Sequence, residues 1–302
     1  MKGVPGIWCR SSLKLSNNYT VKHMKKILLG ILRMLPPDFQ GRLRVVFYNL
    51  LMLLSRGVSY RPFRIARVGG QVWLLTQQQQ QIYLAIPDRV GFYKMGIAKR
   101  LSALQSSFGV ERFDIAATDY VIDIGANIGE FSLPILNKGA KVMLFEMDPN
   151  VMNALELNVG AYKNACIYKF GLWEETKQVP MFVNSSSADT SLIDDGGAGG
   201  SDVQCFKLDD VEGICSIPRI KLLKCDAEGA EPEVLRGAVS VLKKTQFISI
   251  DCGPERGPQN ERTLDGVRKL LEHLGFVILQ ERYGSREILV AENSRFSTAK
   301  GA

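Results

Sequence analysis

The residues of this chain that could carry chemistry begin with a glycine turn. Asp123, Gly125, Asn127 and Gly129 alternate with apolar residues, directly after the short apolar run 120–124. Such a run is typical of a buried parallel strand, and glycines let the backbone approach a ligand closely. A helix beginning near Gly129 would direct its unpaired N–H groups into the same crevice. The segment therefore predicts a ligand site at the end of a strand, with an ordinary strand–turn–helix as the alternative.

A carboxylate about twenty residues after the turn indicates which ligand is expected. Glu146 closes the apolar run 141–145, and a carboxylate there can accept hydrogen bonds from the hydroxyls of a ribose. A dinucleotide site needs glycine where Asn127 stands, and the charge of Asp123 would repel a pyrophosphate. The same charge suits an ammonium group. The pattern favours S-adenosylmethionine over a nicotinamide dinucleotide.

A second group of carboxylates follows the apolar run 220–225. Asp226, Glu228 and Glu231 lie at the end of a predicted strand, where open α/β sheets bind ligands. Alternatively they form a solvated cap on a helix beginning near Glu231, because carboxylates favour a helix N-terminus. Since neither histidine of the chain lies in these motifs, a carboxylate is the expected general base for an acceptor hydroxyl.

Taken together, these motifs resemble the FkbM family of S-adenosylmethionine-dependent methyltransferases. The resemblance rests on D-I-G-A-N-I-G-E-F-S at 123–132, F-E-M-D-P at 145–149 and L-K-C-D-A-E-G-A-E at 223–231, followed by V-L-R-G-A at 234–238. It covers roughly residues 118–250 and implies O-methylation, often of sugar hydroxyls in polysaccharides or glycosylated metabolites. Met147 replaces a proline common in the family, and Cys225 falls between Lys224 and Asp226. Neither departure removes a group that the cofactor site needs.

The motifs and the resemblance together predict a set of site residues. The expected cofactor-binding residues are Asp123, Gly125, Ala126, Asn127, Gly129, Glu130, Ser132, Glu146, Met147, Gly171 and Leu172. Among them Asp123 would orient the ammonium end and Glu146 the ribose, with the adenine near Gly171 by analogy of fold. The expected catalytic residues are Asp226 as first choice of base, Glu228 and Glu231 as second choices, and Lys224 to steer or neutralise an anionic acceptor.

Several functional alternatives stay open on the sequence alone. No bound metal is expected, and a divalent ion held by Asp226, Glu228 and Asp251 is the alternative. The expected acceptor is a hydroxyl of a polysaccharide, lipid-linked glycan or glycosylated metabolite. A nicotinamide-dependent oxidoreductase and a non-catalytic nucleoside-binding or membrane-docking module are the competing functions.

Charge is divided unevenly along the chain. Residues 1–118 hold 18 Lys/Arg and 4 Asp/Glu, a net charge of +14, whereas residues 119–302 hold 20 and 27, a net charge of −7. The apolar runs 27–32 and 45–54 are each shorter than the ~20 residues that span a bilayer. Separated by Pro36-Pro37, they predict two basic helices. These helices either lie on an anionic membrane or pack on the core with their cations in water.

Partners and compartment follow from the same composition. An anionic acceptor would explain the cations equally well, whereas nucleic acid is not expected because no nucleic-acid-binding motif accompanies the charge. Six irregularly spaced cysteines form neither a CxxC pair nor a zinc pattern, which fits a reducing cytosol. The run M-K-K-I-L-L that begins at Met24 resembles the beginning of a signal peptide, but no small-residue cleavage site follows it, so export is not expected. We expect a cytoplasmic protein, with peripheral contact at the inner face of the membrane as an open alternative.

The elements that must position these residues predict an α/β fold. We expect a Rossmann-like class I methyltransferase with a mostly parallel, doubly wound sheet, a C-terminal β-hairpin, and an N-terminal helical and hairpin extension. Expected domains are a basic helical extension at 1–60, a β-hairpin and helix cap at 61–117, and the methyltransferase domain at 118–302. Expected strands are 121–124, 142–145, 167–170, 222–225, 247–250, 276–280 and 288–291, and expected helices lie near 91–108, 130–137, 150–159, 233–243 and 260–274. Residues 77–81 are expected to form a loop and 185–200 a mobile loop or plain linker.

Overall fold

The computed structural model of this chain describes residues 37–56, 61–184, 189–194, 199–282 and 286–297. The first predicted helix, around 27–32, lies outside these residues.

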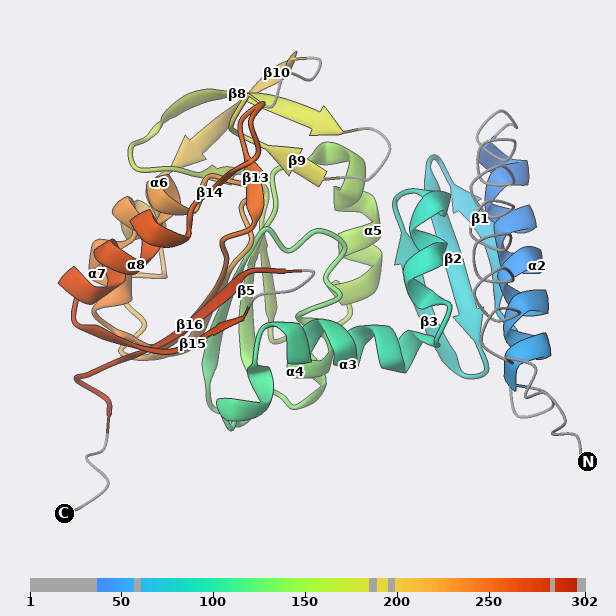
Figure 1. The fold of residues 1–302 in the computed structure, drawn as a ribbon, viewed down its shortest axis with the longest axis horizontal. Helices are drawn as coiled ribbons and strands as arrows, with labels where there is room; N and C mark the ends of the chain where they lie inside the picture. The colour runs from blue at the N-terminus through green and yellow to red at the C-terminus, as the bar shows by residue number, and fades with distance from the viewer. Residues whose placement is uncertain (1–36, 57–60, 185–188, 195–198, 283–285, 298–302) are drawn as a thin grey trace, which may run out of the picture.

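A seven-stranded sheet forms the centre of the molecule, in the order β15-β16-β12-β11-β4-β5-β6 (Figure 1). Its strands are β4 (Tyr120–Ile124), β5 (Lys141–Phe145), β6 (Ala165–Tyr168), β11 (Ile220–Cys225), β12 (Thr245–Asp251), β15 (Phe276–Arg282) and β16 (Ile288–Asn293). Only β16 runs against its neighbours, pairing antiparallel with both β12 and β15. The predicted α/β fold, with its mostly parallel sheet and C-terminal hairpin, is confirmed.

The central strands are mostly apolar because both faces of the sheet are covered. Successive residues of β5 alternate between two apolar cores: Val142 and Leu144 enter one, Met143 and Phe145 the other. The covering helices are α4 (Leu133–Asn137), α5 (Pro149–Val159), α6 (Glu231–Arg236), α7 (Val239–Leu242) and α8 (Leu264–His273). A strand buried on both faces reads as a continuous apolar run, which is why these strands were recognisable in the sequence.

Three predicted helices differ from the structure in their bounds or in their continuity. The helix expected at 130–137 begins only at Leu133, after a turn. The helix expected at 233–243 is broken into α6 and α7 around Gly237, where a Cβ would lie 2.0 Å from the carbonyl oxygen of Trp173. The one expected at 260–274 is preceded by the short hairpin of β13 (Pro254–Arg256) and β14 (Glu261–Arg262).

A second, four-stranded sheet lies over one end of the central sheet. Its order is β7-β10-β8-β9, with β7 (Gly171–Leu172), β8 (Lys177–Asn184), β9 (Asp189–Ser191) and β10 (Gly199–Phe206). The interpretation of 185–200 as a loop was therefore wrong for β9 and for the start of β10. A segment rich in Ser, Asp and Gly lacks the apolar alternation that identifies a strand, so the pairing with β8 decides its structure.

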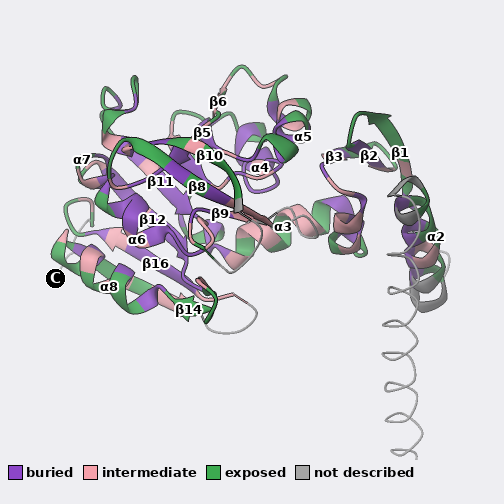
Figure 2. Cartoon of the chain, turned by 90° about the horizontal axis from the view of Figure 1, so that it is seen from above, coloured by how far each residue is buried: buried purple, intermediate pink, exposed green. Residues whose placement is uncertain are grey.

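The N-terminal part forms a separate layer beside the sheet (Figures 1 and 2). Strands β1 (Arg64–Gly69), β2 (Val72–Gln77) and β3 (Gln80–Leu84) form an antiparallel sheet. Helix α2 (Pro37–Arg56) packs on β1 and on the 3₁₀ turn η2 (Pro87–Tyr93), which is followed by α3 (Ile97–Ser107). The β-hairpin expected within residues 61–117 is confirmed: β1 and β2 pair antiparallel, and the chain turns between them at Gly69-Gly70. The expected loop 77–81 is a tight turn at Gln78 (φ +57°), and the expected helix 91–108 is interrupted at Gly96 (φ +114°). Among the described helices, none is long and apolar enough to cross a membrane.

One asparagine joins this layer to the part of the chain that contains the seven-stranded sheet. On α5, Asn158 exchanges two hydrogen bonds with the backbone of Tyr83 in β3, at 2.8 and 2.9 Å, and also donates to the carbonyl oxygen of Ile128 at 2.8 Å. Because Ile128 belongs to the glycine turn, the N-terminal layer is tied directly to the segment expected to bind the cofactor.

Candidate active site

A cavity opens at the carboxyl ends of β4, β5 and β11, where a doubly wound sheet binds its ligands. Its walls come from the glycine turn, the N-terminal layer, the second sheet and the loop after β11. The residues that line it include Arg89, Arg100, Gly125, Asn127, Glu130, Phe145, Glu146, Phe170, Gly171, Thr190, Lys224, Asp226, Glu228 and Arg286. The structure thus brings most of the sequence-predicted site residues to one place.

The turn after β4 has a shape that only its own residue types allow. Gly125, Asn127 and Gly129 all have positive φ, at +69°, +50° and +87°. A Cβ on Gly125 would lie 1.9 Å from the carbonyl oxygen of Asp226, and one on Gly129 2.8 Å from Val159. The glycines therefore permit both the left-handed backbone and the close approach of the loop after β11.

Glu146 presents a buried carboxylate beside this turn. Its side chain is held by three backbone donors: the N–H of Asn127 donates to Oε2 at 2.7 Å, and those of Met147 and Asp148 donate to Oε1 at 2.8 Å. Burial raises the pKa of Glu146, against the lowering effect of these hydrogen bonds. A carboxylate offers about four lone-pair sites, so Oε2 retains capacity for a ligand hydroxyl.

Asp123 and Ser132 lie behind the turn rather than in the cavity wall. Asp123 is fully buried, accepts from Ser132 Oγ at 2.6 Å, and is paired with Lys224 at 3.0 Å. Lys224 also donates to the carbonyl oxygens of Ile124 and Gly125, at 3.0 and 2.8 Å. Burial alone would lower the pKa of Lys224, but the carboxylate of Asp123 raises it. Lys224 thus fastens β11 to the glycine turn.

The N-terminal layer closes the other side of the turn through Glu130. Arg100 donates to both of its carboxylate oxygens at 2.7 and 3.0 Å, and Tyr93 Oη donates at 2.7 Å. A second guanidinium, that of Arg89, lies with its Nη2 3.9 Å from Glu130 Oε2. Burial alone would raise the pKa of Glu130, but Arg100 holds it below its ordinary value. Sequence reasoning missed both arginines, whose only signal was the excess of basic residues before the turn.

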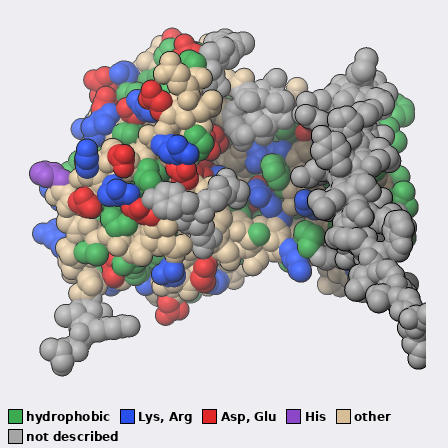
Figure 3. Space-filling model, viewed as in Figure 1, with side chains coloured by type: hydrophobic (Ala, Val, Ile, Leu, Met, Phe, Trp, Pro, Cys, Tyr) green, Lys and Arg blue, Asp and Glu red, His purple; other side chains and the backbone are tan. Residues whose placement is uncertain are grey.

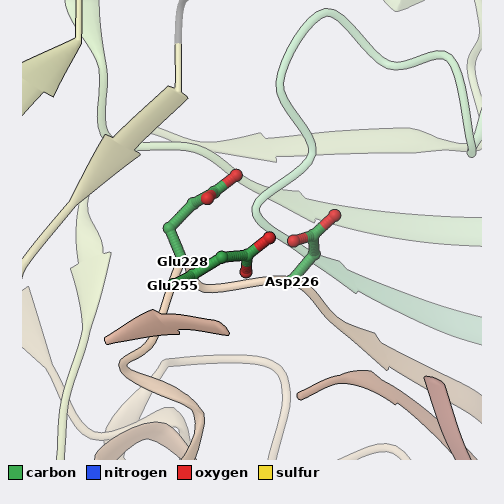
Figure 4. A group of neighbouring side chains, drawn as sticks. All are labelled: Asp226, Glu228 and Glu255. Atoms are coloured by element: carbon green, nitrogen blue, oxygen red, sulfur yellow. The ribbon is translucent and has the colours of Figure 1, made fainter. Parts of the chain in front are cut away.

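Across the cavity, three carboxylates form a cluster that we call the acidic cluster: Asp226, Glu228 and Glu255 (Figure 4). One oxygen of each lies within 4.8 Å of the others. Burial, together with the charges of Asp226 and Asp251, raises the pKa of Glu255 to about 8. Glu255 was missed in the sequence because it lies 24 residues beyond the end of the motif at 223–231, after β12.

Arg286 neutralises part of this negative charge. Its Nη2 lies 2.7 Å from Asp226 Oδ2, and its Nε lies 2.7 Å from Asp251 Oδ2. Burial and Asp226 raise the pKa of Asp251 to about 6. The alternative metal set of Asp226, Glu228 and Asp251 is corrected: among the described residues, the carboxylates whose oxygens lie close enough together to hold an ion are those of Asp226, Glu228 and Glu255.

Glu231, a second-choice base, holds the loop after β11 and lies outside the cavity lining. Its Oε1 accepts from the backbone N–H groups of Ala227 and Gly229, both at 3.0 Å, and its Oε2 accepts from Thr263 Oγ1 at 3.0 Å. These contacts fix the positive φ of Glu228 and Gly229. Burial raises the pKa of Glu231 to about 7.

Glu231→Gln is expected to flatten the dependence of stability on pH between about 5 and 7. The folded protein retains a proton on Glu231 that the unfolded chain releases above its ordinary pKa of 4.5. The stability this supplies is complete at lower pH and is lost as the pH rises through about 7. Glutamine keeps the acceptor oxygen for the two N–H groups but does not titrate. Denaturant unfolding at several pH values measures the slope; a slope equal to that of the unchanged protein would contradict the prediction.

The remaining wall of the cavity is apolar and aromatic. Gly171 and Leu172 of β7 line it beside Phe145 and Phe170, and Phe145 lies 5.8 Å from Phe170 in an edge arrangement. Thr190 of β9 donates to Asp148 Oδ2 at 2.6 Å, which brings the second sheet over the cavity. A flat aromatic ring fits such a wall, next to the buried Glu146.

Comparison with known proteins supports this reading of the site. The model of the methyltransferase FkbM domain matches residues 123–278. The chain is 28% identical over 235 residues to methyltransferase sdnD of Sordaria araneosa, covering 65% of this chain and 89% of that protein. It is 21% identical to the 2-O-methyltransferase NoeI of Sinorhizobium fredii, covering 64% and 87%. It is 25% identical to the hexuronic acid methyltransferase AglP of Haloferax volcanii, covering 50% and 63%.

The match to the family model extends from Asp123 in β4 to the first residues of β15. It includes the turn, Glu146 and the acidic cluster, and spans more than half of the chain. The chain belongs to the FkbM methyltransferase family.

Proposed function

We propose that this chain transfers a methyl group from S-adenosylmethionine to a hydroxyl of a sugar, in a polysaccharide, a lipid-linked glycan or a glycosylated metabolite. The observation that carries the proposal is the pairing of two features in one cavity. The buried carboxylate of Glu146 lies beside the glycine turn, and Asp226 and Glu228 of the acidic cluster line the same cavity.

The donor set of the cavity fits S-adenosylmethionine. Glu146 retains acceptor capacity for a ribose hydroxyl, the wall at Phe170 and Gly171 suits an adenine, and the narrow turn at Gly125 leaves backbone beside the methionine portion. Arg89 and Arg100 line the end beyond Glu130, where their charges would favour the methionine carboxylate. When bound, the cofactor supplies an electrophilic methyl group on a sulfonium.

The names of two relatives support a sugar hydroxyl as the acceptor. NoeI is a 2-O-methyltransferase and AglP acts on a hexuronic acid, according to their names. A sugar offers hydroxyls that carboxylates can bind, and the acidic cluster supplies such acceptors beside the expected position of the methyl group.

The chain's own residues then have two tasks, positioning the acceptor and receiving its proton. Methyl transfer is an in-line displacement, so its rate depends on holding the acceptor oxygen close and aligned. We assign hydrogen bonding of the acceptor to Asp226 and Glu228, and proton uptake to the acidic cluster that they form with Glu255. Arg286 holds Asp226 in place and balances its charge. A base whose pKa lies near the working pH is the most efficient, which favours Glu255, with its pKa of about 8.

The proposal is tested by supplying the purified protein with methyl-labelled S-adenosylmethionine and a panel of sugars. The panel contains free hexuronic acids, nucleotide sugars, oligosaccharides and lipid-linked sugars. We expect label to enter one class and S-adenosylhomocysteine to form in equal amount. Binding of NADH in place of S-adenosylhomocysteine would favour the oxidoreductase alternative, and nucleoside binding with no transfer to any class would favour a binding module.

Asp226→Asn is expected to lower kcat by about 10²-fold, because Asp226 positions the acceptor oxygen and misplacement of a reacting group costs a loss of that order. The affinity for S-adenosylhomocysteine should change less than about threefold, since Asp226 faces the acceptor. A matched control is Glu233→Gln: Glu233 is also a carboxylate paired with an arginine, Arg256, at 2.9 Å, but it lies outside the cavity lining. Single-turnover kinetics would measure both. A kcat for Asp226→Asn equal to that of the control would contradict the assignment.

A further inference from the structure

Helix α2 carries an apolar surface that nothing in the described structure covers. Its outward residues lie three and four positions apart, so they fall within about 80° on the helix. Each of them is between 40% and 62% exposed: Phe39, Leu43, Val46, Leu50 and Leu53. We call this set the α2 stripe. Of the eleven large apolar side chains that are exposed among the described residues, five lie here. In Figure 3 hydrophobic side chains, drawn in green, appear along the right-hand edge of the molecule, where α2 lies in Figure 1.

The opposite face of α2 is fixed against the N-terminal layer, so the stripe cannot turn inward. Val45, Tyr48 and Met52 are buried in the core that this layer shares with the methyltransferase half. Arg44 is also buried and pairs with Asp88 at 2.9 Å. Turning the helix to bury the stripe would expose these side chains and separate that ion pair. The exposure of the stripe is therefore built into the fold.

The surroundings of the stripe are strongly basic. Residues 37–70 contain six arginines and a single acidic residue, Asp38. Arg42 on α2 is exposed, as are Arg61, Arg64 and Arg67 in and next to β1, the strand that packs beside α2. Residues 1–36 add seven Lys/Arg and no acidic residue.

We propose that the α2 stripe docks this protein on an anionic lipid surface. A helix with apolar side chains on one face and cations around it lies in the headgroup plane, where burial of the side chains and attraction to anionic lipid act together. A second copy of the chain would place the same basic surfaces against each other, which like-charge repulsion opposes. The basic segment 1–36 would meet the same repulsion.

The docking surface is coupled to the cavity through a short path. The Arg44–Asp88 ion pair joins α2 to η2, and the next residue of η2, Arg89, lines the cavity. Docking by α2 would thus hold the N-terminal side of the cavity near the lipid surface. This inference stands on the exposed surface and does not depend on the proposed acceptor.

The test is sedimentation of the full-length protein with vesicles. One set contains equal parts of phosphatidylglycerol and phosphatidylcholine, and the other contains phosphatidylcholine alone. We expect binding to the anionic vesicles that weakens with added salt. Val46→Gln with Leu50→Gln should weaken it at least tenfold. Arg42→Gln with Arg64→Gln should weaken it by about 25-fold, at about fivefold for each cation lost near the surface.

A matched control is Leu157→Gln, which removes an equally exposed leucine from α5; its binding should equal that of the unchanged protein. Three results would overturn the proposal. One is equal binding to both kinds of vesicle. The second is a dimer that Val46→Gln with Leu50→Gln dissociates, which would make a second copy the occupant. The third is a loss of more than about 5 °C in unfolding temperature for that double variant, which would show that the chain itself covers the stripe. The affinity for S-adenosylhomocysteine, measured by calorimetry, should be the same in every one of these variants as in the unchanged protein.

Discussion

Glu146→Gln is expected to weaken the binding of S-adenosylhomocysteine about 100-fold. A hydrogen bond to a charged acceptor contributes about 1.5–3 kcal/mol, and the variant removes the charge beside the expected ribose. Its new amide NH₂ group replaces one carboxylate oxygen, so at least one of the backbone N–H donors of Asn127, Met147 and Asp148 loses its acceptor. Isothermal titration calorimetry of the purified protein measures the change.

A ligand variant separates loss of the ribose contact from general damage to the site. S-adenosylhomocysteine lacking both ribose hydroxyls should bind the unchanged protein about 100-fold more weakly than the normal ligand. It should bind Glu146→Gln with nearly the same affinity as the normal ligand does. If Glu146→Gln still bound the normal ligand about 100-fold more tightly than the ligand without ribose hydroxyls, the hydroxyls would be held by other residues and the assignment of Glu146 would be refuted.

Gly125→Ala is expected to destabilise the protein by more than about 3 kcal/mol and to abolish measurable cofactor binding. Two effects combine at this position. The left-handed backbone at φ +69° costs a residue with a Cβ about 1–2 kcal/mol. In addition, the new Cβ would lie 1.9 Å from the carbonyl oxygen of Asp226, so the turn and the loop after β11 must separate. Because the acidic cluster begins at Asp226, both walls of the cavity would move.

The chain offers a control that isolates the close approach. Gly213 has a similar φ of +83°, but a Cβ there would have no atom within 4 Å. Gly213→Ala should therefore lose only the conformational cost, about 1–2 kcal/mol, with cofactor affinity unchanged. Denaturant unfolding of both variants gives the difference. Equal destabilisation by the two substitutions would show that the contact with Asp226 is unimportant.

Much of the fold could be predicted because its signals are local. The central strands are buried on both faces and so appear as apolar runs in the sequence. Gly125 and Gly129, which follow one of these runs, are typical of a tight turn. The exceptions are equally physical. Strand β9 has no apolar alternation, and its pairing with β8 is a contact that the sequence does not display.

Only the part of the site that is formed by the two sequence motifs, the glycine turn with Glu146 and the segment 223–231, could be predicted from the sequence. Glu146, the glycine turn, Asp226 and Glu228 all line the cavity. Asp123 and Lys224 belong to the same motifs but pair with each other beneath the turn. The sequence shows that Asp123 lies near the end of a strand, but it does not show its partner. Lys224 belongs to a neighbouring strand that is about one hundred residues away in the chain.

What the sequence determined by itself is the parallel α/β frame, the family and the cofactor-side motifs, because each depends on residues close together in the chain. The tertiary structure alone decided the rest of the site. Arg89 and Arg100 reach Glu130 from the N-terminal layer, and Glu255 and Arg286 meet Asp226 from beyond β12 and β15. Buried charges such as these are stabilised by specific partners, and only folding brings those partners together.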